Sequence, residues 1–518
     1  MAIIDMFDRG WDTNPDGVAY IADDREYGFD EIGRLSCRIA NALVALDLPK
    51  ETKGAVLAGN DPTSWTCVLG LWRAGLAWVP VNPRNSVEAN IGTLESFDCE
   101  VLFFQAAFEP MIEGLKAALP NIKHWICVEK AVAGCPSLDE WIDGHSDERP
   151  DVDYAMDDVV AVMPTGGTTG KSKGVMNTHR SFGAFCASFM ITCSYRADEP
   201  IVNLAAAPMT HTAGVLSLPC TARGGTVVVL TKPEPSAVLD MFEQHGVTEL
   251  FLPPTVIYRL LDEPGVSDRD LSSLRYFISG AAPLSVDKLR RAIDVFGPVM
   301  MQGYGQTEAP AAIAMLRPEE YLVDGEPADE ERLSACGRTS PMVKVAIRGD
   351  DGVALPKGET GEICVRGDLV MKGYYKNPEQ TAETIVDGWL HTGDVGYQDS
   401  AGYLHITDRS KDMIITGGFN VYPNEVEQVI WSHPAVQDCS VIGVPDDDWG
   451  EAVKAVVELN PGEEVDPDEL IEMCKTKLGS VKAPKTVDFI DALPRSPVGK
   501  VLKTELRKSY WATAERAI

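Results

Sequence analysis

The sequence lacks any excess of basic side chains. Its 518 residues include 46 lysines and arginines against 78 aspartates and glutamates, so the formal net charge at pH 7 is −32. Nucleic acids and anionic membranes are bound through basic surfaces, and we therefore expect neither as a partner. An acidic chain that binds an anionic ligand must concentrate its lysines and arginines at that site. The acidity itself fits either a saline habitat or a need for solubility.

Paired cysteines and long apolar runs are absent as well. The 12 cysteines form no Cys-x-x-Cys pair, which argues against a disulfide framework or a zinc site and for reduced thiols in a cytoplasm. No apolar run reaches the length of a membrane span, and residues 68–81 are interrupted by Arg73. The first residues have neither the basic nor the apolar region of a signal peptide. These absences predict a cytoplasmic protein with no transmembrane segment.

What is present is the composition of a soluble globular protein, with 45% hydrophobic and 24% charged residues. A chain of this length exceeds one typical core, so we expect two or three units. Between about residues 50 and 305, short apolar runs alternate with helical patterns such as 236–244 and 284–295, which predicts α/β layers with mainly parallel sheets. The expected buried strands are residues 55–57, 78–81, 101–104, 125–128, 159–163, 201–205, 227–230, 250–252 and 276–278.

The pattern changes after about residue 340. Residues 343–347, 362–365 and 403–406 are short apolar runs separated by Gly-Asp turns, as in a small antiparallel β-barrel. A further change follows Lys411 and predicts a compact α+β unit of roughly 110 residues. The expected helices are residues 425–431 and 469–478, and the expected strands are residues 440–444, 453–458 and 486–490.

The most informative segment is a polar loop that directly follows the apolar run 159–163. Glycines let backbone N–H groups turn inward around an anion, while hydroxyls and lysines add donors and charge. We therefore interpret the loop as a cradle for the phosphates of a nucleotide. The residues expected to contact those phosphates are Thr165, Gly166, Gly167, Thr168, Thr169, Gly170 and Lys173.

Three other interpretations of this loop are possible. A Walker A loop needs a glycine, then four further residues, then Gly-Lys-Ser, and Thr165 occupies the position of that first glycine. Residues 170–174 match the Gly-x-Ser-x-Gly nucleophile elbow, but Ser172 stands late in the loop between two lysines. A flexible surface loop would explain the glycines but not the clustered hydroxyls and lysines.

The loop resembles the phosphate-binding signature of the adenylate-forming superfamily, which includes acyl-CoA synthetases, 4-coumarate–CoA ligases, firefly-type luciferases and peptide-synthetase adenylation domains. Many members have Ser at the position of Gly166, and the Gly-Gly version looks like that of bacterial fatty-acyl–CoA ligases. Other family motifs follow in family order along nearly the whole chain. The resemblance implies an N-terminal adenylation domain (1–407), a hinge (408–412) and a small mobile C-terminal domain (413–518).

The segment 302–308 matches the family's contacts to adenine, the α-phosphate and metal. The resemblance implies that the aromatic ring covers adenine, that Thr307 donates to the α-phosphate, and that Glu308 holds Mg²⁺ together with Thr168. The alternative is a glycine-rich turn with a capping threonine. Further implied nucleotide contacts are Gln302, Gly303, Tyr304, Gly305, Gly280, Ala281, Ala282 and Pro283, although a plain strand-to-helix turn would also explain residues 280–283.

The family also assigns Asp394, Ile406 and Arg409 to the ribose and phosphate. A lone aspartate after glycine is usually a turn residue, but a downstream Asp-Arg-x-Lys-Asp motif accompanies it here. Within that motif Lys411 resembles the hinge residue, which the two-step chemistry needs because one site must first adenylate an acid and then admit a thiol. The alternative for Lys411 is an ordinary exposed lysine.

Two groups in the C-terminal part match further family positions. Lys500 resembles the catalytic lysine, whose ammonium stabilises the charge that develops when a carboxylate approaches an ATP phosphate. Gly417, Gly418 and Phe419 match the segment that lets the pantetheine arm of coenzyme A pass close to the backbone.

The resemblance places His211 beside the reacting carboxylate and implies an acyl pocket near His211, Phe185, Gly280, Gly303 and Ala309. Many relatives carry an aromatic residue where this chain has Thr210, and a core histidine is the alternative for His211. The segment lacks the aspartate with which amino-acid-activating domains hold an α-ammonium group, which argues against an amino-acid substrate. The glycines leave room for a flat ring or a chain.

We therefore predict an AMP-forming acid–CoA ligase that uses ATP, Mg²⁺ and coenzyme A and acts on a fatty or aryl acid. The partners are these small molecules, and a homodimer is the assembly considered. Two alternatives remain: an acyl-AMP-forming enzyme that loads a carrier protein or stops at acyl-AMP, and a nucleotide-binding protein without catalysis. Lys500 and Glu308 argue against the second alternative.

Overall fold

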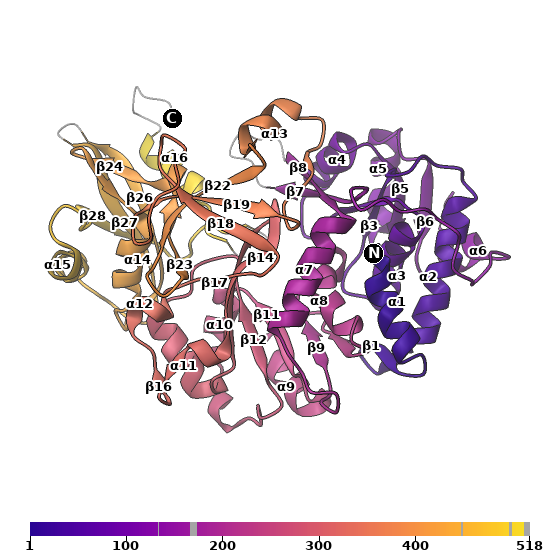
Figure 1. The fold of residues 1–518 in the computed structure, drawn as a ribbon, viewed down its shortest axis with the longest axis horizontal. Helices are drawn as coiled ribbons and strands as arrows, with labels where there is room; N and C mark the ends of the chain where they lie inside the picture. The colour runs from indigo at the N-terminus through magenta and orange to yellow at the C-terminus, as the bar shows by residue number, and fades with distance from the viewer. Residues whose placement is uncertain (133, 166–172, 447–448, 497–499, 512–518) are drawn as a thin grey trace.

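The computed structural model of the chain describes residues 1–132, 134–165, 173–446, 449–496 and 500–511 (Figure 1). These residues form one 14-stranded, one seven-stranded and one five-stranded sheet, together with a two-stranded hairpin. In Figure 1 the chain begins at the right in indigo and reaches the five-stranded sheet at the left in orange and yellow. The predicted α/β fold with a smaller C-terminal unit is confirmed.

The seven-stranded sheet has the order β20-β8-β7-β4-β3-β5-β6. Its five strands from β7 to β6 are parallel, as the near-continuous apolar runs predicted. Trp65 and Trp72 from α3 pack edge-on against each other and against Trp78 of β4, with ring centroids 5.5–6.0 Å apart. The strands are β3 (Lys53–Leu57), β4 (Ala77–Pro80), β5 (Cys99–Phe104), β6 (His124–Cys127), β7 (Val159–Thr165), β8 (Lys173–Thr178) and β20 (Gly373–Tyr374).

Six helices belong to this N-terminal region. Helix α3 begins at a buried proline after Asp61, whose carboxylate caps the helix by accepting from the backbone N–H of Ser64. The helices are α1 (Ile4–Thr13), α2 (Phe29–Val44), α3 (Pro62–Arg73), α4 (Val87–Ser96), α5 (Glu109–Ala118) and α6 (Leu138–Ile142), with a short turn η1 (Ala106–Phe108) before α5.

The 14-stranded sheet changes from parallel to antiparallel along its length. Strands β1, β10, β9, β11, β12 and β13 pair in parallel, whereas β14, β17, β23, β22, β19 and β18 continue the sheet in antiparallel order. The strands are β1 (Val18–Ala22), β2 (Arg25–Gly28), β9 (Val202–Ala205), β10 (Thr226–Val229), β11 (Glu249–Leu252), β12 (Tyr276–Ser279), β13 (Met300–Gln306), β14 (Ala309–Leu316), β17 (Gly337–Thr339), β18 (Val343–Arg348), β19 (Gly361–Gly367), β21 (Ile385–Val386), β22 (Trp389–Gln398) and β23 (Tyr403–Arg409).

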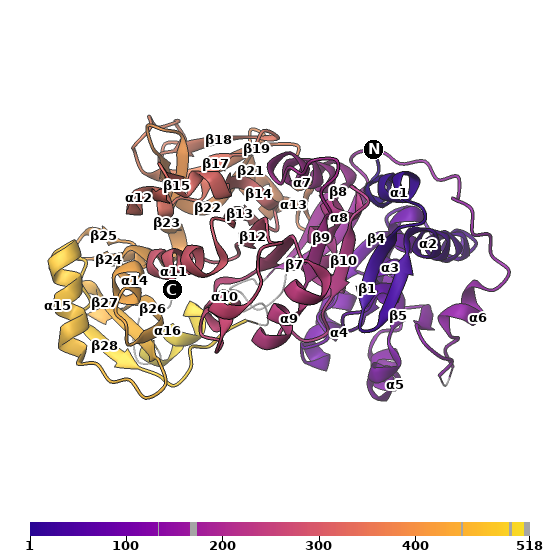
Figure 2. The same ribbon diagram turned by 90° about the horizontal axis from the view of Figure 1, so that it is seen from below.

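Helices cover both faces of the parallel half of this sheet (Figure 2). Helices α7 and α8 share a core with the seven-stranded sheet, while α9, α10 and α11 form a second core on the opposite face. This two-sided burial explains why the parallel strands are apolar throughout. The helices are α7 (His179–Thr192), α8 (Gly214–Thr221), α9 (Pro235–His245), α10 (Pro254–Leu261) and α11 (Val286–Phe296), with a π-helical turn η2 (Met209–Ala213) before α8 and a short turn η3 (Val266–Asp268).

The strands expected to form a small barrel are antiparallel, as predicted, but they form one end of the 14-stranded sheet and not a separate barrel. The link is β14, which pairs with β13 on one side and β17 on the other. Short elements connect these strands: η4 (Pro318–Glu320), β15 (Leu322–Val323), β16 (Glu326–Pro327), α12 (Glu330–Leu333) and α13 (Pro378–Thr384). The turn η5 (Ser410–Asp412) follows the last of them, β23.

The C-terminal unit is an antiparallel sheet to which β28 adds in parallel, covered by helices. Its own apolar core includes Val426, Val441, Val457 and Leu470. The elements are β24 (Ile414–Thr416), β25 (Phe419–Val421), α14 (Pro423–Trp431), β26 (Val436–Asp446), β27 (Gly450–Leu459), α15 (Pro467–Leu478), β28 (Thr486–Phe489) and α16 (Lys503–Trp511). This is the α+β pattern expected after Lys411.

Two further findings bear on the predictions from composition. Among the described residues no helix combines the length and the apolar character that a membrane crossing requires. All 12 cysteines are present as buried free thiols.

Candidate active site

Four parallel strands, β9, β11, β12 and β13, end at the same edge of the large sheet. In such sheets ligands bind beyond the carboxyl ends of the strands. At this edge β13 turns directly into β14: Gln306 pairs with Ala309, so Thr307 and Glu308 form the two-residue tip of a hairpin. The hairpin holds the predicted phosphate and metal contacts at the strand ends.

Close backbone packing explains the small residues of this edge. A Cβ on Gly305 would lie 2.3 Å from the backbone nitrogen of Ala311, and a Cβ on Gly280 would lie 3.0 Å from the carbonyl oxygen of Gly303. Ala281, which follows Gly280, has a φ of +69°. A left-handed alanine is strained and occurs mainly where function or packing demands it. Ala281 and Pro283 are exposed and Ala282 is partly buried at the strand end.

The hairpin tip is fixed by residues from elsewhere in the chain. Asn177 Nδ2 donates to the Thr307 carbonyl at 3.2 Å, and the backbone N–H of Met371 donates to the Glu308 carbonyl at 2.8 Å. The Tyr374 hydroxyl donates to Glu308 Oε1 at 2.8 Å. Burial of the Tyr374 ring, and to a lesser extent the neighbouring Glu308 carboxylate, raises the pKa of Tyr374. The phenol therefore stays protonated and acts as the donor.

The phosphate loop starts and ends beside this tip. Thr165 and Lys173 are paired residues of β7 and β8, and Lys173 Nζ lies 5.1 Å from the centre of the Tyr374 ring. The structure thus brings Lys173 and Glu308 to the same tyrosine. The predicted contacts Gly166, Gly167, Thr168, Thr169 and Gly170 lie outside the described residues.

Asp394 forms the centre of a buried network. Its Oδ2 accepts from the Tyr304 hydroxyl at 2.8 Å and from Gln306 Nε2 at 2.5 Å, while Oδ1 lies 3.2 Å from Arg409 Nε. Asp394 and Arg409 are cross-strand partners on β22 and β23, where Ile406 pairs with Gly396. Burial, together with the Asp394 carboxylate, raises the pKa of Tyr304. Tyr304 therefore donates, and the network joins three of the predicted nucleotide residues.

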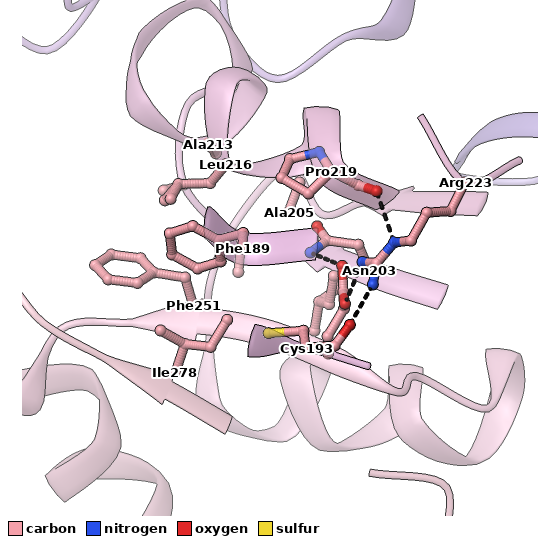
Figure 3. A pocket seen from close by; sticks show the side chains of 14 residues that line it. Phe189, Cys193, Asn203, Ala205, Ala213, Leu216, Pro219, Arg223, Phe251 and Ile278 are labelled. Atoms are coloured by element: carbon pink, nitrogen blue, oxygen red, sulfur yellow. Dashed lines mark hydrogen bonds and ion pairs between the residues drawn. The ribbon is translucent and has the colours of Figure 1, made fainter. Parts of the chain in front are cut away.

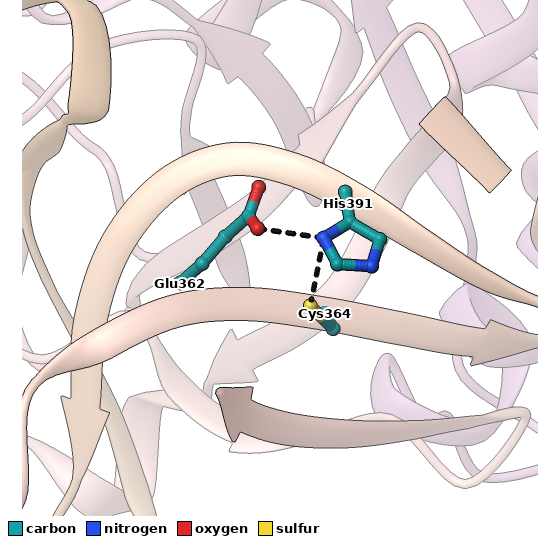
Figure 4. A group of neighbouring side chains, drawn as sticks. All are labelled: Glu362, Cys364 and His391. Atoms are coloured by element: carbon teal, nitrogen blue, oxygen red, sulfur yellow. Dashed lines mark hydrogen bonds and ion pairs between the residues drawn. The ribbon is translucent and has the colours of Figure 1, made fainter. Parts of the chain in front are cut away.

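A second group of side chains supports the turn before Asp394 (Figure 4). His391 Nδ1 lies 2.6 Å from Glu362 Oε2, and the other oxygen of Glu362 accepts from the backbone N–H of Gly393 at 3.0 Å. Cys364 Sγ lies 3.6 Å from the same His391 nitrogen. Burial, with the Glu362 charge, raises the pKa of Cys364 to about 12. The group acts as a hydrogen-bonded support for Gly393, with a neutral thiol.

Lys500 belongs to the C-terminal unit. The residue is exposed, yet nearby protein atoms partly desolvate its ammonium, and the positive charges of Arg409 and Lys411 oppose it. These effects outweigh Asp394 and Asp412 and lower the pKa of Lys500 to about 8. The charges of Asp394 and Arg409, the predicted nucleotide residues of the large sheet, thus act on Lys500 of the C-terminal unit.

Helix α16, which begins three residues after Lys500, is tied to α14 and to the predicted hinge. Partly buried Lys503 Nζ lies 2.8 Å from Glu427 Oε1 of α14, and Arg507 Nη1 lies 3.0 Å from Asp412 Oδ1. The hinge segment includes η5, which separates β23 of the large sheet from β24 of the small one. Asp408, just before it, accepts from the backbone N–H of Asn424 at 2.9 Å. Domain boundaries at 408–412 remain a prediction.

The predicted coenzyme A segment is a tight hairpin. Gly417 and Gly418 connect β24 to β25 with φ values of +57° and +82°, which suits two adjacent glycines in a hairpin turn. A Cβ on Gly417 would meet the Trp449 ring at 2.3 Å, whereas a Cβ on Gly418 would meet nothing within 4 Å. Phe419 and Trp449 are exposed, at 57% and 43%.

The predicted acyl-pocket residues lie on both sides of the strand ends. Phe185 and Ala309 are fully buried, and the Phe185 ring packs 4.8 Å from that of Phe189. Gly280 and Gly303 face each other across β12 and β13. The backbone of His211 belongs to the π-helical turn η2, a conformation that often occurs at functional sites. Its side chain lies outside the described part.

Several site residues were not selected from the sequence. Tyr374 and Asn177 reach the hairpin tip from 66 and 130 residues away, and no local pattern marks them. Gln306 lies within the motif 302–308 but was not selected as a site residue. Its polar side chain in a largely apolar and glycine-rich strand was the feature that could have marked it.

Comparison with known proteins decides the family. The sequence model of the AMP-binding enzymes matches residues 7–375, and that of the AMP-binding enzyme C-terminal domain matches residues 425–500. The chain belongs to the AMP-binding enzymes. The predicted membership of the adenylate-forming superfamily is thereby confirmed.

Individual relatives match most of the chain of this AMP-binding enzyme. A feruloyl-CoA synthase of Amycolatopsis sp is 37% identical over 93% of this chain and 94% of its own. The medium/long-chain-fatty-acid–CoA ligase FadD8 of Mycobacterium tuberculosis is 41% identical over 71% of this chain and 64% of its own. The solved structure of the amide bond synthetase McbA from Marinactinospora thermotolerans superimposes with a TM-score of 0.89 at 31% identity, covering 98% of this chain and 100% of its own.

Proposed function

We propose that this AMP-binding enzyme joins a carboxylic acid to coenzyme A through an acyl-AMP intermediate. The enzyme class predicted from the sequence, an AMP-forming acid–thiol ligase, is confirmed by the family and by relatives named as CoA ligases. The roles of individual residues, the metal and the choice of acid are part of the proposal.

The observation that carries the proposal is the network of Tyr304, Asp394 and Arg409 at the strand ends, whose Asp394 and Arg409 charges also act on the ammonium of Lys500. In the first step a carboxylate oxygen of the acid attacks the α-phosphorus of ATP, and the bond to pyrophosphate breaks. The approaching groups are both negative, so an ammonium aimed between them lowers the barrier. Lys500 supplies that charge, and Thr307 at the hairpin tip donates to an α-phosphate oxygen.

In the second step the coenzyme A sulfur attacks the acyl carbon, the thiol proton is released, and AMP leaves. Gly418, with open space where a side chain would stand, gives the pantetheine arm room beside the backbone. Exposed Phe419 and Trp449 flank this turn, and Lys485 Nζ lies 5.1 Å from the Trp449 ring centre. A cation near exposed rings suits a ligand with phosphates at one end.

Mg²⁺ is the metal that we assign to Glu308. Tyr374 occupies only one of the two carboxylate oxygens, and the hard oxygen donors of a carboxylate are those that Mg²⁺ prefers. Bound there, the ion would neutralise phosphate charge beside Lys173 and the hairpin tip. Thr168, which the family resemblance assigns to the same metal, remains part of the proposed site.

The relatives' names favour an aryl or fatty acid as the substrate. A cytoplasmic location and a homodimer remain predictions from the sequence. A second candidate is an enzyme that transfers the acyl group from acyl-AMP to an acceptor other than coenzyme A, including a carrier protein. The likeness to an amide bond synthetase favours this candidate.

The deciding experiment measures AMP release by the full chain with ATP, Mg²⁺ and a panel of aryl and fatty acids, each with and without coenzyme A. We expect release that requires both an acid and coenzyme A. Equal release without coenzyme A would favour the second candidate. ATP binding without AMP release for any acid would instead indicate a non-catalytic nucleotide-binding protein.

A further inference from the structure

Tyr374 lies on the short edge strand β20, beside the strand that follows the phosphate loop. It is the cross-strand partner of Val175 on β8, and the neighbouring backbone N–H of Tyr375 donates to the Gly174 carbonyl at 2.7 Å. Its own backbone N–H donates to Thr381 Oγ1 of α13 at 2.9 Å. These bonds fix the backbone of Tyr374 relative to the end of the loop.

The side chain of Tyr374 shares a face with residues that reach the hairpin tip. Directly opposed residues of an antiparallel pair place their side chains on one face, and residues two apart on a strand share a face. Tyr374 therefore lies on the same face as Lys173 and Asn177, which stand on either side of Val175 in β8. Asn177 donates to the Thr307 carbonyl at 3.2 Å, so this face looks toward the β13–β14 hairpin.

The hydroxyl of Tyr374 orients the Glu308 carboxylate. It donates to Oε1 at 2.8 Å, while the backbone N–H of Met371 donates to the Glu308 carbonyl at 2.8 Å. Tyr374 is 6% exposed, and burial strengthens such a bond. Among the residues that the structure describes, neither a second donor nor a cation contacts this carboxylate. The bond thus fixes the carboxylate without neutralising it, and Oε2 stays available for Mg²⁺.

The ring of Tyr374 contacts the lysine at the end of the phosphate loop. Lys173 Nζ lies 5.1 Å from the ring centre, within the range of a cation–π interaction. No carboxylate of the described residues forms an ion pair with Lys173. A direct ion pair between Lys173 and Glu308 would remove a charge that the phosphates need and a ligand that the metal needs. In the structure both groups contact Tyr374 instead of each other.

We infer that Tyr374 is a positioning residue for adenylation. Its hydroxyl holds Glu308 in the orientation that binds Mg²⁺, and its ring keeps the ammonium of Lys173 apart from that carboxylate and available to a phosphate. The inference rests on the proposed function, because it concerns the same metal and the same nucleotide. It assigns to one side chain the control of two charged groups.

Tyr374→Phe removes the hydroxyl and keeps the ring. We expect the Mg²⁺ concentration for half-maximal adenylation to rise about fivefold to tenfold, because partners that orient a metal ligand contribute to metal affinity on this scale. The KM for ATP at saturating Mg²⁺ should stay within about twofold of the wild-type value, since the ring still holds Lys173. Both values are measured by pyrophosphate exchange with the full chain, ATP and an acid from the panel of aryl and fatty acids.

Tyr374→Leu removes the ring as well. Lys173 is then free to pair with Glu308, so we expect the KM for ATP to rise at least about fivefold, in addition to the effect on Mg²⁺. Lys173→Met should raise this KM more in the wild type than in the Tyr374→Leu background, because the leucine variant has already lost the use of the lysine. Tyr374→Phe decides the inference alone if the leucine variant does not fold.

Tyr195→Phe is the matched control. The Tyr195 hydroxyl also donates to a carboxylate oxygen, Glu249 Oε2, at 2.9 Å. Figure 3 shows the buried network that joins this glutamate to Asn203 and Arg223 beside a small cavity. Glu249 is the first residue of β11, so this bond lies at the opposite edge of the sheet from the hairpin tip. We expect both values to stay within about twofold in this variant.

Thioester formation from supplied acyl-AMP needs neither ATP nor its metal, so the Tyr374 variants should retain it within about twofold. An equal loss of both half-reactions would indicate a merely structural role and overturn the inference. An unchanged Mg²⁺ requirement in Tyr374→Phe would also overturn it, and so would an equal rise in Tyr195→Phe. If the wild type shows no pyrophosphate exchange with any acid, the proposed function fails and the inference falls with it. If exchange occurs without regard to Tyr374, the inference alone fails.

Discussion

At the scale of single residues, the site depends on backbone positions that accept few side chains. Gly305 contacts Ala311 so closely that any side chain would clash, and Ala281 has a left-handed backbone. Strain of this kind costs on the order of 1 kcal/mol and persists only where packing fixes it. The charged residues Glu308 and Asp394 are held on or beside this frame.

Glu308→Gln should weaken the use of Mg²⁺. The amide keeps the size of the side chain and a bond with Tyr374 but removes the charge that attracts a hard cation. We expect the Mg²⁺ concentration for half-maximal adenylation to rise at least about tenfold, measured by pyrophosphate exchange. The matched control, Glu379→Gln, changes an exposed residue of α13 and should leave this value unaltered. An unchanged Mg²⁺ requirement in Glu308→Gln would contradict the metal assignment.

The pH dependence of adenylation should report Lys500. Its pKa is lowered to about 8, so the ammonium is present below that pH and is lost as the pH rises through it. We expect kcat/KM for acyl-AMP formation to fall about tenfold per unit above pH 8, since this parameter reports the free enzyme. In Lys500→Arg, whose charge does not titrate, the fall should disappear. The same alkaline fall in both proteins would assign it to another group.

The sequence contains much of this residue-scale information. The motifs that contain Asp394 and Arg409 predicted that the two residues act together. In the structure they are cross-strand partners, and Asp394 Oδ1 lies 3.2 Å from Arg409 Nε. Tyr374 and Asn177 could not be selected, because their contacts arise only when segments far apart in the chain fold together.

At the scale of elements, two hairpins present the candidate groups. The β13–β14 hairpin carries Thr307 and Glu308, and the β24–β25 hairpin carries Gly417 and Gly418. Periodicity predicted the buried strands well, because the parallel strands are apolar on both faces. It missed β8, which mixes polar residues and a glycine with two apolar residues, and β14, in which four of the eight residues are alanine. It also did not show that β13 turns back as a hairpin.

Gly418→Asn tests the second hairpin without straining it. Asparagine tolerates the left-handed conformation that Gly418 adopts (φ +82°), and the added side chain would occupy the open space proposed for pantetheine. We expect the KM for coenzyme A to rise at least about tenfold and adenylation to change little. Gly462→Asn is the matched control, since Gly462 has the same φ and equally open surroundings. Equal effects of the two substitutions on the thiol step would refute the channel.

At the scale of the whole molecule, the chain consists of a large part with the nucleotide residues and a small part that carries both Lys500 and the coenzyme A hairpin. In the structure Lys500 lies in the field of Asp394 and Arg409, which is the arrangement that the first step needs. The second step requires the Gly417–Gly418 turn at the same place. A change in orientation about residues 408–412 would satisfy both requirements.

Lys411→Pro should uncouple the two steps. Proline fixes φ near −65° in the short turn η5, and it would hold the small part close to the observed orientation. We expect adenylation to persist and thioester formation to fall by about a hundredfold, as measured in separate half-reactions. Lys411→Ala, which leaves the backbone free, should retain both. Normal overall turnover in the proline variant would mean that any rotation takes place elsewhere.

The most direct test of the central claim is the pair of half-reaction rates in Lys500→Ala. Only the first step brings two negative groups together, so acyl-AMP formation should fall by about a hundredfold to a thousandfold. Thioester formation from supplied acyl-AMP should fall by less than about tenfold. Equal losses in the two half-reactions would contradict the assignment of Lys500 to adenylation.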